Sequence, residues 1–347
     1  MSYFPQVTIT FDAALRDLDS RKGRVRAEAA HALRYADDAN ERERAAEALI
    51  AVLNDDSELV RSEAAISLGE LGCALAIEPL VAGIDDASSL VRQAATKALG
   101  VLAFDAAFAP LKAALAHDQA DVRFCAASAI TVFGAERAVE PLLGALGDAD
   151  GEVAGAVALA LGELGDARAI EPLAELLDHS DTRAQFDAAY ALTELGDDRG
   201  YTRLAAQLAD NDLAWDAIEA LERIGQARAA SPMAQLMTRR RVPPHLALRA
   251  AGALLFLDPQ HEQAERAKQV LLDGLTLRKI EQRGVSAEQL GRVGGDWAIE
   301  PLRAAMKRRG SDVLDIDGAI AAIRERGSHS TALPRTARSD SSNSGTT

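Results

Sequence analysis

Apolar residues of this 347-residue chain recur at a fixed spacing, which one short segment marks clearly. Ile77–Leu80 reads Ile-Glu-Pro-Leu and is followed by related segments at Phe108–Leu111, Val139–Leu142 and Ile170–Leu173. The prolines of these four segments are each 31 residues apart, and the motif returns at Ile299–Leu302. A fixed period of this length is typical of a solenoid, in which each unit buries its apolar face against its neighbours.

Within one period, the apolar positions predict two helices. Ile77, Leu80 and Ile84 fall on one face of a first helix, which is expected to open at the Ile-Glu-Pro-Leu segment with proline in its first turn. Val60 and Leu68 lie on the apolar stripe of a second helix. The predicted fold is therefore all-α: an α-solenoid of antiparallel helix pairs with a period of about 31 residues.

Polar residues and glycines predict where these helices begin and end. Acidic connections such as Asp55–Ser57, Asp85–Asp86 and Asp148–Asp150 precede the second helices, so aspartate and serine are expected to cap them. Each unit ends on a small residue for which a left-handed conformation is expected. These residues are Gly72, Ala103, Gly134, Gly165, Gly196 and Gly225.

The regularity of the repeat divides the chain into four parts. Residues 1–19 form an N-terminal lead-in, and residues 20–225 carry the regular repeats. Residues 226–326 are interpreted as divergent helical repeats with a C-terminal cap. Residues 327–347 are rich in Ser and Thr and lack apolar periodicity, so they are expected to form a disordered tail.

Composition supports a helical protein and narrows its partners. Apolar residues make up 48% of the chain but aromatic residues only 4%, which suits closely packed helices. The net charge of −15 combines −21 over residues 1–225 with +6 over residues 226–347. Because phosphate contacts need basic side chains, no nucleic-acid partner is expected along the acidic part.

The sequence carries no sign of export, membrane insertion or bound metal. We see no secretory signal and no apolar run long enough to span a membrane, so a cytoplasmic protein without membrane insertion is expected. Cys73 and Cys125 are too few for a disulfide framework and are interpreted as small packing residues. Asp148–Gly151 is similar to the opening of a calcium loop, but no glutamate completes the ligand set, so helix capping is favoured.

The repeat resembles a known family. From Asp55 to Gly69 the chain reads Asp-x-x-x-x-Val-Arg-x-x-Ala-x-x-x-Leu-Gly, followed by Ile-Glu-Pro-Leu, which resembles the short HEAT-like repeats first associated with phycobilisome lyases. The resemblance covers residues 20–225 well, 299–326 loosely, and 226–298 only as helical pairs. Some relatives attach or detach bilin chromophores and many others are scaffolds, so the resemblance implies a fold and leaves the activity open.

The second helices change character in the middle of the array. Two positions four residues apart, which share one face of the helix, carry aromatic and apolar residues there, with acidic residues nearby. We expect the apolar side chains to lie close together across adjacent units. The apolar residues are Phe124, Leu159, Phe186, Tyr190 and Trp215, and the acidic residues are Asp187, Asp216 and Glu219. In HEAT-like arrays this helix lines the concave side, so the group is a candidate partner-binding site. The alternative is that the rings fill the core between units.

Arginines occur in two patterns with different interpretations. Arg61, Arg92 and Arg123 recur at one position of the second helix and are expected to bond the aspartates and carbonyls of adjacent connections. Arg239, Arg240 and Arg241 form a basic run that either attracts an acidic partner or is a solvated loop.

Enzyme signatures are mostly missing from the sequence. The six histidines show no Cys/His pairing, and neither a phosphate-binding loop nor a nucleophile elbow is present. We therefore assign no catalytic residue, metal site or cofactor. The leading hypothesis is a non-enzymatic scaffold that binds another protein on its concave surface. The alternatives are a bilin lyase or lyase subunit, and a module that associates with itself.

Overall fold

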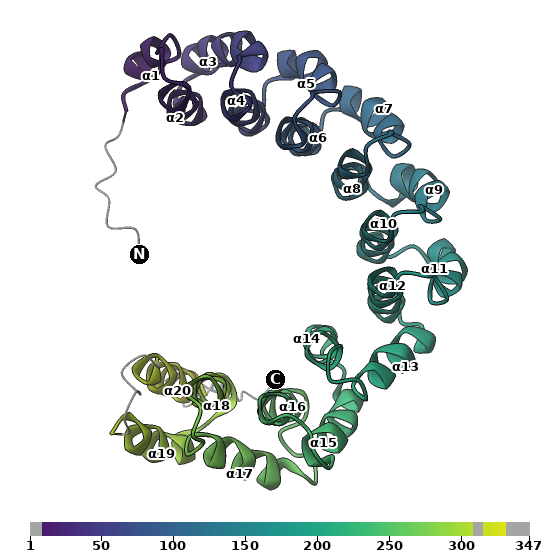
Figure 1. The fold of residues 1–347 in the computed structure, drawn as a ribbon, viewed down its shortest axis with the longest axis vertical. Helices are drawn as coiled ribbons and strands as arrows, with labels where there is room; N and C mark the ends of the chain where they lie inside the picture. The colour runs from purple at the N-terminus through teal and green to yellow at the C-terminus, as the bar shows by residue number, and fades with distance from the viewer. Residues whose placement is uncertain (1–8, 308–314, 331–347) are drawn as a thin grey trace, which may run out of the picture. The chain divides into compact units, whose positions relative to one another are not determined.

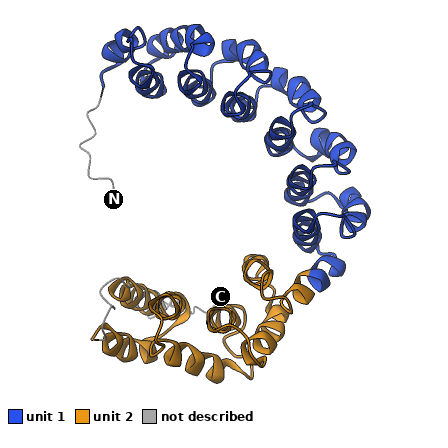
Figure 2. Ribbon diagram, viewed as in Figure 1, with its two compact units in different colours: residues 1–203 blue, residues 204–347 orange. Residues whose placement is uncertain are grey.

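The computed structural model of the protein describes residues 9–307 and 315–330, and within these residues it contains helices and no strand (Figure 1). Helices that are consecutive in sequence form antiparallel pairs, and the pairs stack side by side. The predicted α-solenoid is confirmed. The chain divides into two compact units, residues 1–203 and residues 204–347 (Figure 2).

Unit 1 contains six helix pairs, in which the first helices form one layer and the second helices another. The first helices are α1 (Phe11–Asp17), α3 (Ala39–Ala51), α5 (Ile77–Gly83), α7 (Asp105–Ala114), α9 (Ala135–Ala145) and α11 (Ile170–Leu176). The second helices are α2 (Gly23–Leu33), α4 (Glu58–Leu71), α6 (Ser89–Leu102), α8 (Ala120–Ala129), α10 (Gly151–Leu164) and α12 (Thr182–Glu194). Within this unit, the second helices follow the inner edge of the arc in Figure 2.

Unit 2 continues the same alternation with longer connections. Helix α13 (Asp198–Gln207) crosses from unit 1 into unit 2. The later helices are α14 (Ala214–Ile224), α15 (Ala230–Thr238), α16 (Pro244–Leu257), α17 (Ala264–Gly274), α18 (Ile280–Val293), α19 (Asp296–Met306) and α20 (Ile316–Ser330). Short 3₁₀ turns occupy Val52–Asn54, Ala74–Ala76, Ile130–Phe133, Ala167–Ala169 and Ala227–Ala229.

The core consists of leucines that repeat along the array and small residues that bring helices together. Leu68, Leu99, Ile130 and Leu161 occupy the same position in four successive units and are fully buried. A Cβ atom on Gly69 would lie 2.9 Å from the Cβ of Ala98 on the next second helix, closer than real Cβ contacts. The second helices therefore pack in direct contact because small residues face each other there.

The predicted ends of the units are confirmed by the backbone. All six small residues adopt positive φ, from 51° at Ala103 to 81° at Gly196. Ala103 is the one non-glycine among them, and its Cβ makes this conformation unfavourable by about 1 kcal/mol. Gly134 has positive φ but an extended ψ of 166°, so the left-handed conformation expected at this residue was wrong.

The expected start of the first helices holds in only some units. Helices α5 and α11 begin at the isoleucine of the Ile-Glu-Pro-Leu motif, each after a 3₁₀ turn. In α7, α9 and α19 the helix begins earlier, and Pro110, Pro141 and Pro301 lie inside it. The expectation was wrong there because Asp105, Ala135 and Asp296 begin a helical turn before the motif, which places the proline in the second turn of the helix.

The expected division of the chain can be compared with the structure at three places. Helix α1 packs on α2, so residues 11–17 are part of the first helix pair. The compact units divide at Arg203, whereas the boundary expected at residue 225 marks where the repeat loses its regularity. Helix α20 runs to Ser330, so the backbone of residues 327–330 is helical, and the rest of the expected tail lies outside the described residues. None of the described helices is both long and apolar enough to cross a bilayer.

Candidate functional site

Arginines of the second helices bond the connection of the following unit. Arg61 donates to both carboxylate oxygens of Asp86 at 2.8 Å, and Arg123 bonds Asp148 at 2.6 and 2.9 Å. Each arginine also donates to a backbone carbonyl six residues earlier, as Arg61 does to Asp55 at 2.8 Å. These charge-assisted bonds lower the pKa of Asp86 and Asp148, because the arginine favours the ionised carboxylate.

Arg92 departs from this pattern. The residue at the position of Asp86 and Asp148 in its partner connection is His117, and Arg92 bonds Asp121 at 3.0 Å instead. Its carbonyl bond, to Asp86 at 2.9 Å, is kept. The arginines at 61, 92 and 123 therefore all lie between neighbouring units and are engaged within the fold.

The expected helix caps are divided between two kinds of connection. Asp150 and Asp181 accept hydrogen bonds from N–H groups in the first turns of α10 and α12. The N-cap residues of α4 and α6 are Ser57 and Ser88, and neither makes such a bond, so the expectation was wrong for Ser57 and for the Asp85–Asp86 connection. In those connections the aspartate two residues earlier, Asp55 or Asp86, accepts a hydrogen bond from the serine N–H and also binds an arginine. These bonds hold the connection in place without a capping side chain.

The arginine series ends where α10 and α12 carry Ala154 and Gln185. Gln185 still donates to the carbonyl of the residue six positions earlier, His179, at 2.6 Å, as the arginines do. In α18, Arg283 makes the same carbonyl bond to Leu277 at 3.2 Å. We missed Arg283 from the sequence, although Leu290 and Gly291 follow it at the spacing of Leu68 and Gly69 after Arg61.

A pocket opens on the second helices where the arginine series ends. We call it the α8–α12 pocket, and its volume is about 440 Å³. Its lining residues are Phe124, Ser128, Glu152, Ala156, Leu159, Ala160, Glu163, Arg183 and Asp187. Of the residues predicted to form a site, Phe124, Leu159 and Asp187 are thus brought together, and Phe124 is 42% exposed.

Asp187 is the unusual member of this pocket because it is only 4% exposed. Its Oδ2 accepts from Nε of Arg183 at 3.0 Å, and the Arg183 side chain is itself 62% exposed. A Cβ atom on Gly155 would lie 2.4 Å from Asp187 Oδ2, so the carboxylate packs directly over this glycine of α10. Burial raises the pKa of Asp187, while the bond from Arg183 acts in the opposite direction. The sequence indicated an acidic residue near the candidate site but not its burial, which the glycine on the preceding helix explains.

Phe186 and Tyr190 do not line the pocket. Both are half-buried on α12, with the Phe186 ring 6.0 Å from the Arg183 guanidinium carbon and the Tyr190 hydroxyl donating to Glu194 at 3.1 Å. The expected group of apolar side chains is therefore smaller than predicted.

Trp215 and Glu219 line a different pocket, which lies within unit 2. This α14–α18 pocket has a volume of about 450 Å³. Its lining residues are Trp215, Glu219, Glu222, Arg223, Arg249, Phe256, Glu288 and Arg292. Asp216 is exposed and lines neither pocket.

A buried ionic cluster forms one wall of the α14–α18 pocket. Glu222 is 4% exposed, and its Oε2 lies 2.5 Å from Arg249 and 3.0 Å from Arg292. Arg249 also donates to Gln289 at 3.3 Å, and the two arginines lie over the rings of Trp215 (5.7 Å) and Phe256 (4.7 Å). The sequence analysis missed this cluster because Arg249 falls outside the arginine series.

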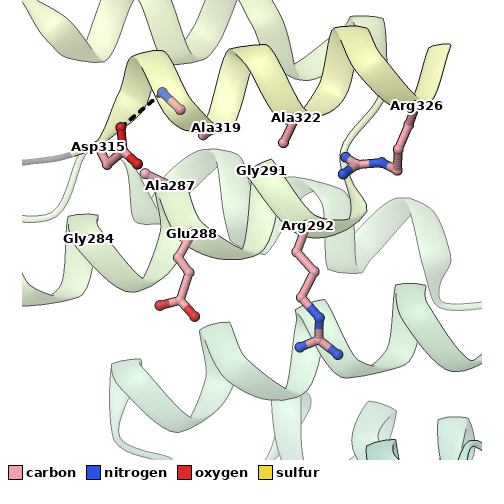
Figure 3. Close-up of a pocket in the computed structure, with 10 residues that line it drawn as sticks. Gly284, Ala287, Glu288, Gly291, Arg292, Asp315, Ala319, Ala322 and Arg326 are labelled. Atoms are coloured by element: carbon pink, nitrogen blue, oxygen red, sulfur yellow. Dashed lines mark hydrogen bonds between the residues drawn. The ribbon is translucent and has the colours of Figure 1, made fainter. Parts of the chain in front are cut away.

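A third hollow, about 580 Å³, lies between α18 and α20 (Figure 3). Gly284, Ala287, Gly291 and Ala319 give it a floor of small residues. Figure 3 shows the side chains of Glu288 and Arg292 directed away from α20. Arg326 at its edge donates to the carbonyl of Gly294 at 3.0 Å.

The basic run is only partly free. Arg239 donates to the carbonyls of Leu208 and Ala209 at 2.8 Å, so it fastens its loop to the preceding helix pair. Arg240 and Arg241 are exposed. Of the three arginines of the expected basic run, Arg239 is therefore engaged within the fold.

Residues of the kind that catalysis or metal binding needs are scattered. Within residues 9–307 and 315–330, no three His, Cys, Asp or Glu side chains come together as a metal ion would require. Cys73 and Cys125 are both free thiols, and burial raises the pKa of Cys125.

With this geometry, the molecule is an α-solenoid of short helix pairs. A family model described as HEAT repeats matches residues 12–100, 77–154 and 139–221, which together cover more than half of the chain. The protein therefore belongs to the HEAT-repeat family. No curated protein matches it in sequence.

The chain is similar to several solved structures. Importin beta has 11% sequence identity and a TM-score of 0.56, over 90% of this chain and 52% of that chain. The complex of CpcE and CpcF of phycocyanin lyase from Nostoc sp. PCC7120 has 28% identity and a TM-score of 0.37, over 78% and 97%. Human deoxyhypusine hydroxylase has 23% identity and a TM-score of 0.33, over 72% and 96%.

Proposed function

We propose that this HEAT-repeat protein is a non-catalytic scaffold, and that it binds a partner protein on the second helices of unit 1 at the α8–α12 pocket. The observation that carries the proposal is the exposure of Phe124, an aromatic side chain at the edge of an open pocket. Exposed aromatic residues beside a hollow are the usual anchors of protein interfaces.

The surroundings of Phe124 support the same proposal. Leu159, Ala156 and Ala160 extend the apolar surface across α10, and Glu152 and Glu163 stand at its edge. An apolar centre with a charged rim is the arrangement found in protein interfaces. The side chains come from three helices that pack directly on one another, so the surface is held by the fold and needs no ordering on binding.

The proposal is tested by affinity capture from native lysate with the full-length protein. The double variant Phe124→Ala/Leu159→Ala is compared with Tyr35→Ala, which removes another exposed aromatic side chain (68%) of unit 1, just after α2. Truncating aromatic anchors typically costs more than about 1–2 kcal/mol of binding energy, so we expect captured partner to fall about tenfold or more in the double variant. Tyr35→Ala should retain it.

Circular dichroism must give the same helical signal for all three proteins. If the double variant captures the same proteins in the same amounts as the wild type, the α8–α12 pocket is not the binding site. An equal loss of captured partner in both variants would mean that exposed aromatic residues bind proteins non-specifically.

A further inference from the structure

The α8–α12 pocket has a strong excess of negative charge. Three carboxylates line it, those of Glu152, Glu163 and Asp187, against the single guanidinium of Arg183. The excess extends to the whole of unit 1, because residues 1–203 contain 18 Lys and Arg against 35 Asp and Glu. A partner that enters this field is favoured if it is basic.

Asp187 provides a specific position for that basic charge. A buried carboxylate is unfavourable unless it is paired, and Asp187 is paired with Arg183, whose side chain is mostly in solvent. Gly155 below it leaves the space that the carboxylate occupies, and Leu159 forms the apolar floor beside it. The pocket thus combines an apolar surface with a single buried negative charge.

We propose that the α8–α12 pocket receives a lysine or arginine side chain from a basic segment of the partner protein; this rests on the proposed function above. Both side chains carry an apolar stem and a charged end, and the stem would lie against Phe124 and Leu159 while the end pairs with Asp187. The ring of Phe124 can also attract a cation over its face.

In the free protein, Arg183 is the cation that pairs with Asp187. It makes one bond to Asp187, and its own side chain is mostly in solvent, so an incoming cation can replace it while the Arg183 guanidinium moves into water. The two members of the pair therefore have opposite roles in binding. Asp187 attracts the partner, and Arg183 competes with it.

The test uses a library of random linear peptides displayed on phage and selected on the full-length protein. We expect the selected peptides to be enriched in Lys or Arg flanked by apolar residues. The strongest peptide is then synthesised, and its Kd is measured by calorimetry on wild type, Asp187→Asn and Arg183→Ala. Asp187→Asn should weaken binding about tenfold or more, and Arg183→Ala should strengthen it about two- to fivefold.

A peptide with norleucine in place of its basic residue separates charge from packing. It should bind the wild type about tenfold more weakly than the parent peptide, and Asp187→Asn should no longer distinguish the two. A purely structural ion pair would instead make both protein variants weaker binders, or neither.

The outcomes separate this inference from the proposed function. Selection of neutral or acidic peptides that lose binding in Phe124→Ala but not in Asp187→Asn would overturn the inference and leave the binding surface in place. Recovery of the same peptides on Phe124→Ala/Leu159→Ala as on the wild type, or of no enriched peptide at all, would contradict both.

Discussion

The two pockets on the second helices are built alike, but their buried carboxylates have different kinds of ion-pair partner. Each draws its lining from three successive second helices. In the α14–α18 pocket, Glu222 lies between Arg249 and Arg292, which come from two different helices. In the α8–α12 pocket, Asp187 has an exposed arginine from its own helix as its partner.

The difference separates a carboxylate used for stability from one available for binding. Glu222 joins α14 to α16 and α18, so breaking its bonds loosens contacts between helix pairs. Asp187 and Arg183 are both on α12, so the bond between them does not connect one helix to another. Burial alone therefore does not indicate the role of a carboxylate; the elements that its partners come from do.

Removing an arginine from each pocket should give the largest difference between them. We expect Arg249→Met to lower the free energy of unfolding by about 3 kcal/mol, because it leaves Glu222 buried with one partner fewer. Arg183→Met should change it by less than about 1 kcal/mol, because Arg183 is mostly exposed and because Asp187, whose pKa is raised by burial, can take up a proton when its partner is lost. Urea unfolding followed by circular dichroism measures both. Similar losses in the two variants would contradict the distinction.

The bonds between units of unit 1 provide an intermediate case. Asp86 accepts two hydrogen bonds from Arg61 of the preceding unit, and we expect Asp86→Asn to destabilise the protein by about 1.5 kcal/mol at pH 7. Asp118→Asn, in a corresponding connection but with an exposed side chain, is the matched control and should change little.

The effect of Asp86→Asn should also depend on pH. The folded-state pKa of Asp86 lies below its ordinary value, so its carboxylate contributes stability above about pH 4, and this is lost as the pH falls through the folded pKa. The variant and the wild type should therefore converge in acid. A constant difference down to the lowest pH would mean that the carboxylate charge contributes nothing.

Local patterns made much of the fold predictable from the sequence. The spacing of Pro79, Pro110 and Pro141 predicts the repeat, and glycines such as Gly72 predict where units end, because each signal lies within one unit or repeats identically in the next. The arginine series was predictable for the same reason, since Arg61 and its partner Asp86 keep a regular spacing.

The candidate site was less predictable because it depends on packing between units. Asp187 is buried because Gly155, on the preceding second helix, leaves room for it, and neither residue signals this alone. Trp215 was expected beside Phe124, but it lines a pocket with Arg249 in unit 2. In the divergent repeats the position of Arg249 no longer follows the motif, so the sequence offered no pattern from which its partner could be inferred.

The smallest expected effect, and the one that tests the comparison most directly, is that of Asp187→Asn on stability. Burial raises the folded-state pKa of Asp187 above its unfolded value, so folding favours the protonated carboxyl. The stability that goes with this group is fully present below the unfolded pKa, near about 4, and is lost as the pH rises through the folded pKa.

Asparagine resembles the protonated form at every pH. Asp187→Asn should therefore melt slightly above the wild type at pH 7 and at the same temperature near pH 4, which is the opposite sign to Asp86→Asn. Thermal unfolding by circular dichroism at both pH values measures the difference, with Asp118→Asn again as the control. If Asp187→Asn lowers the melting temperature at pH 7, then the bond to Arg183 outweighs burial, and Asp187 belongs with Glu222 and Asp86 among the carboxylates that hold the fold together.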